Sequence, residues 1–185
     1  MIGQSHSAAG ELEAIPENLF REPVDYLYAE HFRQRVVCKF LEEIAFDPTA
    51  RNAARLASIV LAYLEQELPH HVADEEQDLF PRLRGRCGAA DNAGRMLDML
   101  SEEHRRDGDL CEAALEGLRA LTEGRQPDQG AAFVRAAAAF AETQRRHLAW
   151  EDEVVLPLAR ERLTSEDLVD MGRSMAERRG ANYPD

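Results

Sequence analysis

Two stretches of the chain repeat one arrangement of residues that can hold metal ions. Residues His71–Pro81 and His147–Pro157 each begin with a histidine, carry a glutamate four residues later and end with a proline ten residues later. Four residues make just over one helical turn, so Glu75 and Glu151 each point the same way as the histidine before them. Imidazole and carboxylate groups aimed inward from helices are common ligands of transition metals. Two such helices facing each other predict a two-metal site.

His31 and His104 extend the repeat to the segments that precede these stretches. Each follows a glutamate, Glu30 or Glu103, and each is itself followed by a cysteine seven residues later. The first half of the chain therefore corresponds to the second half. Such a duplication predicts a pseudo-two-fold axis along a bundle of helices. The symmetry leads us to expect His31 to face His104, and the two H-x-x-x-E histidines to face each other.

Burial of these histidines and glutamates together favours the metal interpretation over a structural one. A single histidine on an apolar helix stripe is usually a hydrogen-bonded core residue. Four in corresponding positions, together with two carboxylates, would cost several kcal/mol per charge if they had no partner. Bound cations remove that cost. The candidate metal ligands are His31, His71, Glu75, His104, His147 and Glu151.

Other polar residues near these positions have simpler interpretations. His70 and Asp74 also lie four residues apart, but a proline ten residues after the histidine, as the repeat requires, follows His71 and not His70. His70 is rotated by about 100° from His71, so we expect it to support the site or face solvent. The acidic residues Asp74, Glu76 and Asp78 are expected to form a solvated face.

Residues one turn or two turns from the candidate ligands could support the site without binding a metal. Tyr28, Gln34 and Asp107 lie about a turn from His31 or His104 and are candidates for hydrogen bonds to it. Cys38 and Cys111 lie about 10 Å along the helix from their histidines, which is too far to share the metals. We interpret these two cysteines as small apolar core residues.

The composition fits a helical protein that can position these residues. The 185 residues are 44% apolar and only 6% aromatic, and helix-favouring residues dominate. One domain is the expected organisation at this length. We predict an all-α, up-down-up-down four-helix bundle with an internal two-fold repeat at residues 23–162. A lead-in at residues 1–22 precedes it, and a short helix and tail at residues 163–185 follow it.

Turn and capping residues set the expected helix boundaries. The first helix should run from Pro23 to about Phe46, and the second from the break at residues 47–49 to about Arg84, with a kink at Pro69. Asp47–Thr49 and Asp91 are the expected caps of the second and third helices. The fourth helix should end near Arg162. A fifth, roughly Ser165–Arg178, should begin after Thr164.

Charge and hydropathy limit the partners and the location. The formal net charge of −13 argues against nucleic acid and anionic membranes as partners. The chain has no run of about 18 apolar residues that could span a bilayer. Residues 1–21 have no apolar signal core, and the three cysteines form no disulfide framework. We therefore expect a cytoplasmic protein.

These motifs resemble the hemerythrin-like, HHE cation-binding family. The resemblance covers roughly residues 23–162, with one H-x-x-x-E motif followed by Leu79-Phe80-Pro81 and a second motif at His147. It implies a four-helix bundle around two non-haem iron ions bridged by an oxo or hydroxo group. By position, the six candidate residues become the iron ligands. The two glutamates, Glu75 and Glu151, become the carboxylate bridges.

The sequence departs from the oxygen carriers of this family at two positions. The oxygen carriers have a second histidine in the third helix, four residues after the first, where this chain has Gly108. Their fourth helix has an aspartate ligand five residues after the histidine. Here Asp152 occupies that position, and Glu151 lies four residues after His147. Four histidines, two bridging glutamates and an oxo bridge leave roughly one open position per octahedral iron, unless Asp107 or Asp152 closes one. Gly108 either makes space beside the metals or allows a neighbouring helix to pack closely.

Open positions on both irons favour a protein that binds dioxygen, peroxide or nitric oxide in redox or oxidative-stress chemistry. Peroxidase- or catalase-like turnover is one form of this function. The alternatives are a sensor of oxygen, nitric oxide or redox state that has no turnover, and iron storage or handling. A sensor would need a contact surface for a protein partner or a second copy. The C-terminal helix, with Met171, Met175 and Arg178–Arg179, is the candidate surface.

Overall fold

The computed structural model describes residues 12–128 and 130–184, and within these ranges every regular element is helical. The first long rod is α1 (Pro23–Phe46). The second rod runs without a break through α2 (Ala53–Ala62), η2 (Tyr63–Glu67), α3 (Leu68–Ala73), η3 (Asp74–Leu79) and α4 (Phe80–Arg86). The third is α5 (Ala93–Thr122), and the fourth joins α6 (Gly130–Trp150), η5 (Glu151–Val155) and α7 (Leu156–Arg162). The last helix is α8 (Ser165–Arg178), and short 3₁₀ turns form η1 (Glu17–Arg21) and η4 (Ala89–Asp91).

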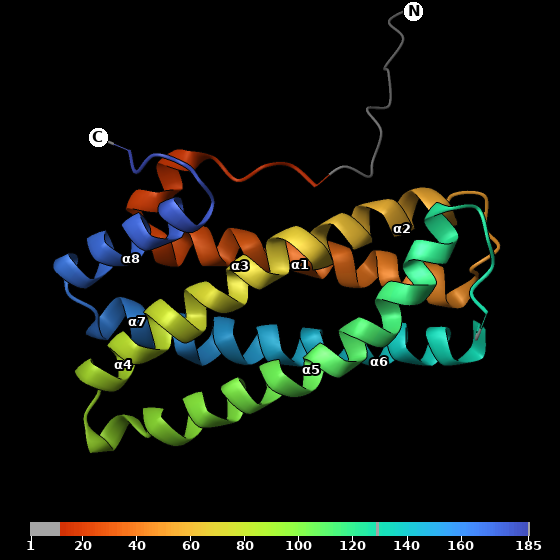
Figure 1. The fold of residues 1–185 in the computed structure, drawn as a ribbon. Coiled ribbons are helices and arrows are strands. Elements are labelled where there is room, and N and C mark those ends of the chain that lie inside the picture. Colours follow the sequence, from red (N-terminus) through yellow and green to blue (C-terminus); the bar gives the residue numbers. More distant parts are fainter. Residues whose placement is uncertain (1–11, 129, 185) are drawn as a thin grey trace, which may run out of the picture.

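Successive rods run in opposite directions and pack side by side, while α8 lies at one end against η1, α1 and η3 (Figure 1). The rod containing α6 packs between α1 and α5, and α2 packs against the same two helices. This arrangement confirms the prediction of an all-α, hemerythrin-like fold. The bounds predicted for α1 and α8 agree with the structure. Residues 1–11 of the expected lead-in and Asp185 of the expected tail lie outside the described residues.

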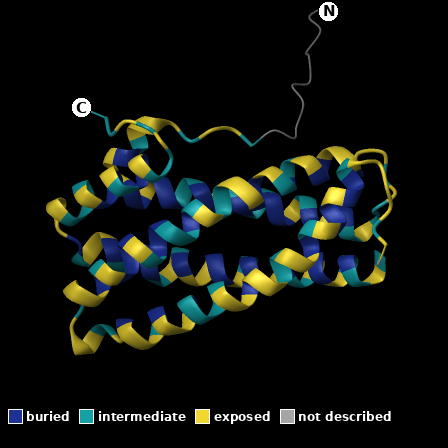
Figure 2. Ribbon diagram, viewed as in Figure 1, coloured by how far each residue is buried: buried dark blue, intermediate teal, exposed yellow. Residues whose placement is uncertain are grey.

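The rods turn their buried faces toward one another and their exposed faces outward (Figure 2). Buried apolar side chains form two clusters. One contains residues such as Leu27, Leu83 and Leu97 near α8, and the other contains residues such as Leu41 and Val60 toward the opposite end. Each rod therefore carries two apolar segments, and the candidate metal ligands lie in the polar layer between them.

Three π-helical turns interrupt the second and fourth rods, and each turn ends two residues before a proline. In η2, η3 and η5 the N–H of the residue preceding the proline donates to the carbonyl five residues earlier, as Leu68 does to Tyr63 before Pro69. A proline has no N–H for a carbonyl four residues back, and its ring clashes with that carbonyl. The helix widens by one residue to avoid the clash. The kink expected at Pro69 is thus one of three related π-turns.

Two of the expected helix caps are wrong, and one is confirmed. Asp47 accepts hydrogen bonds from Thr49 within the turn, and α2 begins only at Ala53 after Asn52. Asp91 accepts the Gly88 N–H and so closes η4, leaving Asn92 before α5 in a left-handed conformation. These acidic residues satisfy amides in the turns rather than in the helices. Thr164 caps α8 through a reciprocal pair of bonds with Asp167.

The segment before α1 is tied to α8 over the residues that the structure describes. Phe20 in η1 is buried and stacks on Tyr26, with 4.7 Å between ring centroids. The backbone carbonyl of Phe20 approaches Gly172 so closely that a Cβ at this glycine would lie 1.9 Å from the oxygen. Only glycine therefore allows α8 to lie against η1. No helix in the described residues is long and apolar enough to cross a membrane.

Candidate metal centre

The six residues predicted from the repeat meet in the layer between the two apolar clusters. They form two groups, each of which places four nitrogen and oxygen atoms within 4.8 Å of one another. One group contains His31 and His71, and the other contains His104 and His147. Both groups share the carboxylates of Glu75 and Glu151. The arrangement could hold two metal ions with two histidines each and two glutamates between them.

The donor atoms of this layer lack the partners that buried polar atoms normally have. The Nε2 atoms of His31 and His71 and all four carboxylate oxygens of Glu75 and Glu151 are buried without a hydrogen bond. Nε2 of His104 and Nε2 of His147 lie 3.0 Å from each other, and they lie 3.2 Å from Glu75 Oε2 and 3.0 Å from Glu151 Oε1, respectively. An unsatisfied buried polar group costs about 1–3 kcal/mol. A set of imidazole and carboxylate donors that is unsatisfied at one centre fits a pair of transition-metal ions.

The structure pairs the histidines differently from the symmetric expectation. Ring centroids are 5.1 Å apart for His31 and His71 and 4.7 Å apart for His104 and His147. The ring contacts therefore join two histidines of one repeat, rather than His31 to His104 or His71 to His147. Consecutive antiparallel helices pack beside each other, so each half of the repeat supplies the two histidines of one group. The internal two-fold repeat therefore relates the group with His31 and His71 to the group with His104 and His147.

A second carboxylate engages the far nitrogen of each histidine. Two of these carboxylates directly precede a candidate ligand in the sequence: Glu30 lies 3.1 Å from Nδ1 of His71, and Glu103 lies 3.0 Å from Nδ1 of His147. A carboxylate at Nδ1 fixes the ring orientation and leaves Nε2 free for a metal. Each glutamate thus holds the histidine of the neighbouring helix, not the one beside it in the sequence.

The other two carboxylates directly follow Glu75 or Glu151 in the sequence. Asp152 Oδ1 lies 2.6 Å from Nδ1 of His31, and Glu76 Oε1 lies 2.6 Å from Nδ1 of His104. Arg35 donates to the other oxygen of Asp152, and Ser101 donates to the other oxygen of Glu76, at 2.8 Å. Asp152 therefore supports a candidate ligand from outside the centre. The sequence signal for all four carboxylates is their repeated position next to a ligand.

Carboxylates raise the pKa values of the histidines when no metal is bound. Burial alone would lower the pKa of His31, but Asp152, Glu75 and Glu151 together raise it to about 9. Burial likewise lowers the pKa values of His104 and His147, but nearby carboxylates outweigh it. Glu75 raises the pKa of His104 to about 9, and Glu151 raises that of His147 to about 10. The pKa of Glu75 is lowered, because the histidine charges outweigh the effect of its burial. Imidazolium charge thus balances the carboxylates in the metal-free centre.

The acidic residues of η3 are not the solvated face that the sequence suggested. Asp74 and Asp78 are buried and pair with arginines from the end of α8. Arg178 donates to both, and Arg179 donates to Asp74 at 2.6 Å and to Glu30 Oε1 at 2.7 Å. Since Glu30 also holds His71, a chain of ion pairs connects α8 to the metal centre. The repeat could not reveal this link, because α8 lies outside it.

The face of α8 that was considered as a partner surface is already occupied within the chain. Met171 and Met175 are fully buried against the bundle, and Arg178 and Arg179 are paired internally.

Tyr28 and His70, which the sequence suggested as supporting residues, lie outside this link. Tyr28 donates its hydroxyl to the backbone carbonyl of Asp152 at 3.3 Å. His70 is half-buried and belongs to neither group of candidate ligands, as expected.

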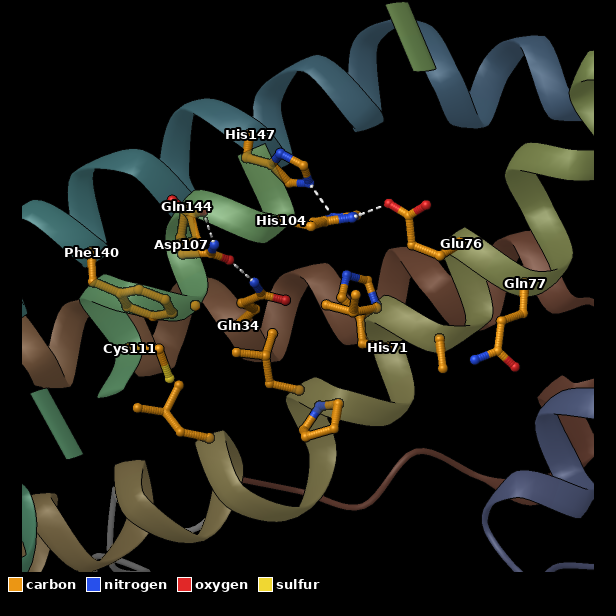
Figure 3. Close-up of a pocket in the computed structure, with 16 residues that line it drawn as sticks. Gln34, His71, Glu76, Gln77, His104, Asp107, Cys111, Phe140, Gln144 and His147 are labelled. Atoms are coloured by element: carbon orange, nitrogen blue, oxygen red, sulfur yellow. Dashed lines mark hydrogen bonds and ion pairs between the residues drawn. The ribbon is translucent and has the colours of Figure 1, made fainter. Parts of the chain in front are cut away.

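A cavity of about 420 Å³ opens beside the centre. Figure 3 shows His71, His104 and His147 toward one part of it and Cys111 and Phe140 toward the other. Cys38 is buried as expected. Cys111 lines this cavity, and burial raises its pKa to about 11. The cavity is a part of the site that the spacing of ligands along the sequence could not indicate.

A chain of hydrogen bonds crosses the cavity between these two parts. Tyr63 donates its hydroxyl to Gln34 Oε1 at 3.1 Å, Gln34 donates to Gln144, and Gln144 donates to Asp107 Oδ2 at 2.6 Å. Burial raises the pKa of Asp107. Gln34 and Asp107 line the cavity beside the centre, but their side-chain hydrogen bonds go to Gln144 and Tyr63 rather than to His31 or His104. The sequence pattern indicated no role for Gln144 or Tyr63.

Gly108 faces this cavity rather than a neighbouring helix. A Cβ built at this residue would meet no atom within 4 Å. The alternative that Gly108 allows close helix packing is therefore wrong. The open space beside the centre is the interpretation that the structure supports.

Comparisons with known proteins agree with this geometry. The chain matches the family described as "Hemerythrin HHE cation binding domain" over residues 22–159. It is also similar to a protein of Haemophilus influenzae that is described as an uncharacterized protein. The two sequences are 26% identical over 167 residues, which cover 86% of this chain and 91% of that protein.

Proposed function

The chain belongs to the hemerythrin HHE cation-binding family, and from this premise we propose that it is a non-haem di-iron protein. In this proposal His31 and His71 bind one iron, His104 and His147 bind the other, and Glu75 and Glu151 bridge them. The bound pair takes up a small oxidant, namely dioxygen, peroxide or nitric oxide. We further propose that the protein serves redox or oxidative-stress chemistry.

The observation that carries the proposal is the set of buried donor atoms without partners. Six of them converge, and both carboxylates lie between the two histidine pairs. A single structural zinc prefers four ligands in a tetrahedron, and one such ion would leave two histidines of this set unused. Two ions that share the glutamates would use all six residues. This supports a pair of metals, and the choice of iron rests on the family.

Different residues of the chain would have different roles at such a centre. When bound, two iron ions would supply Lewis acidity and two electrons. The outer carboxylates keep each Nε2 directed inward, and the two apolar clusters exclude water from both ends of the layer. The cavity beside His104 and His147 gives a small oxidant access from one side. Asp107 lines this cavity, and burial raises its pKa, so it could hold a proton beside a bound oxidant.

The first experiment is to measure the metal content and the visible spectrum of the protein. The anaerobically reduced protein would be examined before and after the addition of dioxygen and then of peroxide. Two irons per chain, charge-transfer bands after oxidation and rapid consumption of peroxide would support the enzymatic form of the proposal. Two irons with a stable dioxygen adduct would support a carrier or sensor. No iron, or a single zinc ion, would exclude the proposal.

The link between α8 and the centre supports sensing as the second candidate function. Arg179 contacts Glu30, and Glu30 contacts His71, so a change at one metal position would act directly on the docking of α8. Exchange of hydrogen in the amides of α8 would test this alternative. A sensor should show faster exchange in α8 in one ligation state than in the other, without turnover of peroxide.

A further inference from the structure

The cavity beside the centre is much larger than a dioxygen or hydrogen peroxide molecule requires. Its volume is about 420 Å³, whereas one water molecule needs roughly 10–15 Å³ of the same kind of space. Cavities that hold organic ligands occupy about 300–1,000 Å³ and are lined mainly by apolar side chains with a few polar groups. The size and the lining of this cavity therefore match an organic ligand.

The polar and apolar parts of the lining are separated. His71, His104 and His147 lie toward one part, and Phe140 and Cys111 lie toward the other (Figure 3). Further apolar residues line the cavity from the second rod, namely Leu64, Leu68, Pro69, Val72 and Ala73. A molecule with one polar group and an apolar body would therefore fit with its polar group toward the metals.

The amide side chains of the lining suit an uncharged polar group. The cavity is lined by no lysine or arginine of the described residues, and two carboxylates, Glu76 and Asp107, belong to it. The amides of Gln34 and Gln144 each have two hydrogens, and each donates one to its neighbour in the chain. The second hydrogen of each remains for the oxygen of a neutral ligand. A ligand with an uncharged polar group can therefore hydrogen-bond to these amides.

The cavity is lined by α5 on one side and by the second rod on another. α5 packs closely against α2 at one end and against α4 at the other, and it meets the intervening η3 through hydrogen bonds of Ser101 and His104 to Glu76. The cavity lies in this interval, and Gly108 on α5 adds no side chain to close it. Gly108 is itself exposed, so the cavity is open to solvent at this residue.

We propose that this cavity binds an organic hydroperoxide, with its peroxide group toward the metals and its apolar body against Leu64, Leu68 and Phe140. The inference rests on the proposed function, since it names the class of peroxide that the same centre would receive. Reduction of such a molecule breaks the O–O bond and consumes two protons and two electrons, one from each of two reduced metal ions. The products are an alcohol and water.

A binding measurement tests the cavity separately from the metal chemistry. The probe is 2-phenyl-2-propanol, the alcohol left when cumene hydroperoxide is reduced, titrated calorimetrically into the metal-loaded and the metal-free protein. Gly108→Leu places a side chain in the open space and should weaken binding at least tenfold, and Gly108→Phe should weaken it further. Gly94→Leu is the matched control, because Gly94 is an exposed glycine on the same helix with nothing within 4 Å of its Cβ position. This control should bind the alcohol as the original chain does.

A kinetic measurement then tests the peroxide itself. The reduced, metal-loaded protein would be mixed with cumene hydroperoxide or with hydrogen peroxide, and the two rate constants compared. We expect the ratio of the organic to the inorganic rate constant to fall at least tenfold in Gly108→Leu and to be unchanged in Gly94→Leu. Thermal unfolding of each variant shows that the fold is retained.

The outcomes separate this inference from the proposed function. Reaction with hydrogen peroxide but no binding of the alcohol would overturn the cavity proposal alone. Equal binding of the alcohol by the original chain and by Gly108→Phe would also overturn it. Absence of a metal pair would exclude the proposed function, and the peroxide proposal with it, even if the alcohol bound in the cavity.

Discussion

The backbone carbonyl of Glu75 accepts the N–H of Phe80, five residues later and directly before Pro81. The same relation joins Glu151 to the N–H before Pro157. Each of these glutamates therefore lies in the first part of a π-turn that its proline enforces, because the proline ring cannot approach the carbonyl four residues earlier. The proline ten residues after each histidine is thus part of the candidate metal centre through the backbone.

Replacement of these prolines should weaken metal binding without unfolding the protein. In Pro81→Ala the new N–H can donate to the carbonyl of Gln77, so the turn can return to α-helical geometry and rotate Glu75. We expect metal affinity to fall about tenfold and the melting temperature of the metal-free protein to stay equal or rise. Pro69→Ala is the control, since its π-turn carries no candidate ligand. Equal losses in both variants, measured by metal titration, would contradict this account.

The sequence was sufficient to predict the parts of the site that depend on helical periodicity. His31, His71, His104 and His147 lie on inward stripes, and the repeat identified the two glutamates between them. The ends of α1 and α8 followed from Pro23 and Thr164, because their local chemistry decides those boundaries. Periodicity within one helix is a local property, so one sequence reveals it.

The remaining features depend on how the rods pack against one another. Arg179 reaches Asp74 and Glu30 only because α8 folds back across the bundle, more than 100 residues later in the chain. The cavity likewise results from the distance between α3 and α5. Contacts of this kind have no fixed spacing in the sequence. The acidic run of η3 was therefore taken for a solvated face, although two of its members are buried.

The shared glutamates should couple the two metal positions. In our proposal His31 contributes to one position only, whereas Glu75 belongs to both groups. We expect His31→Ala to retain about one metal ion per chain and Glu75→Ala to retain much less than one. Metal analysis after gel filtration would measure both values. A full complement of two ions in Glu75→Ala would exclude a bridging role for this residue.

Metal binding and the stability of the metal-free protein should depend on pH in opposite ways. The pKa values of His31 and His104 are raised to about 9, and that of His147 to about 10. Raised pKa values stabilise the fold fully below the unfolded value of about 6.5 and lose this effect as pH rises through 9–10. The metal-free protein should therefore lose stability between pH 6.5 and 10. Metal ions compete with these protons, so their apparent affinity should rise over the same interval.

Two titrations would test this relation. Thermal unfolding of the metal-free and the metal-loaded protein should show a falling melting temperature only in the metal-free form. Calorimetric metal binding in two buffers of different ionisation enthalpy should show the release of protons at pH 7. A melting temperature of the metal-free protein that rises from pH 6.5 to 9 would contradict the charge balance described for the centre.

Loss of the arginine at the end of α8 should affect one metal position more than the other. Arg179 contacts Glu30, and Glu30 contacts His71. Glu103, which contacts His147, lies outside this chain of ion pairs from α8. Removal of a partner from a buried ion pair costs about 3–5 kcal/mol. We expect Arg179→Ala to destabilise the protein by this order and to weaken one of two metal-binding steps by about 10–100-fold.

The control for this variant is Arg173→Ala, because Arg173 lies on the exposed side of α8 and its side chain is 63% exposed. It should leave both binding steps unchanged. Arg179→Lys should restore part of the stability, since a lysine can pair with one carboxylate but cannot span Glu30 and Asp74 as the guanidinium does. Equal weakening of both binding steps in Arg179→Ala would mean that α8 stabilises the bundle as a whole. A selective loss would establish that α8 acts on the His71 position through Glu30.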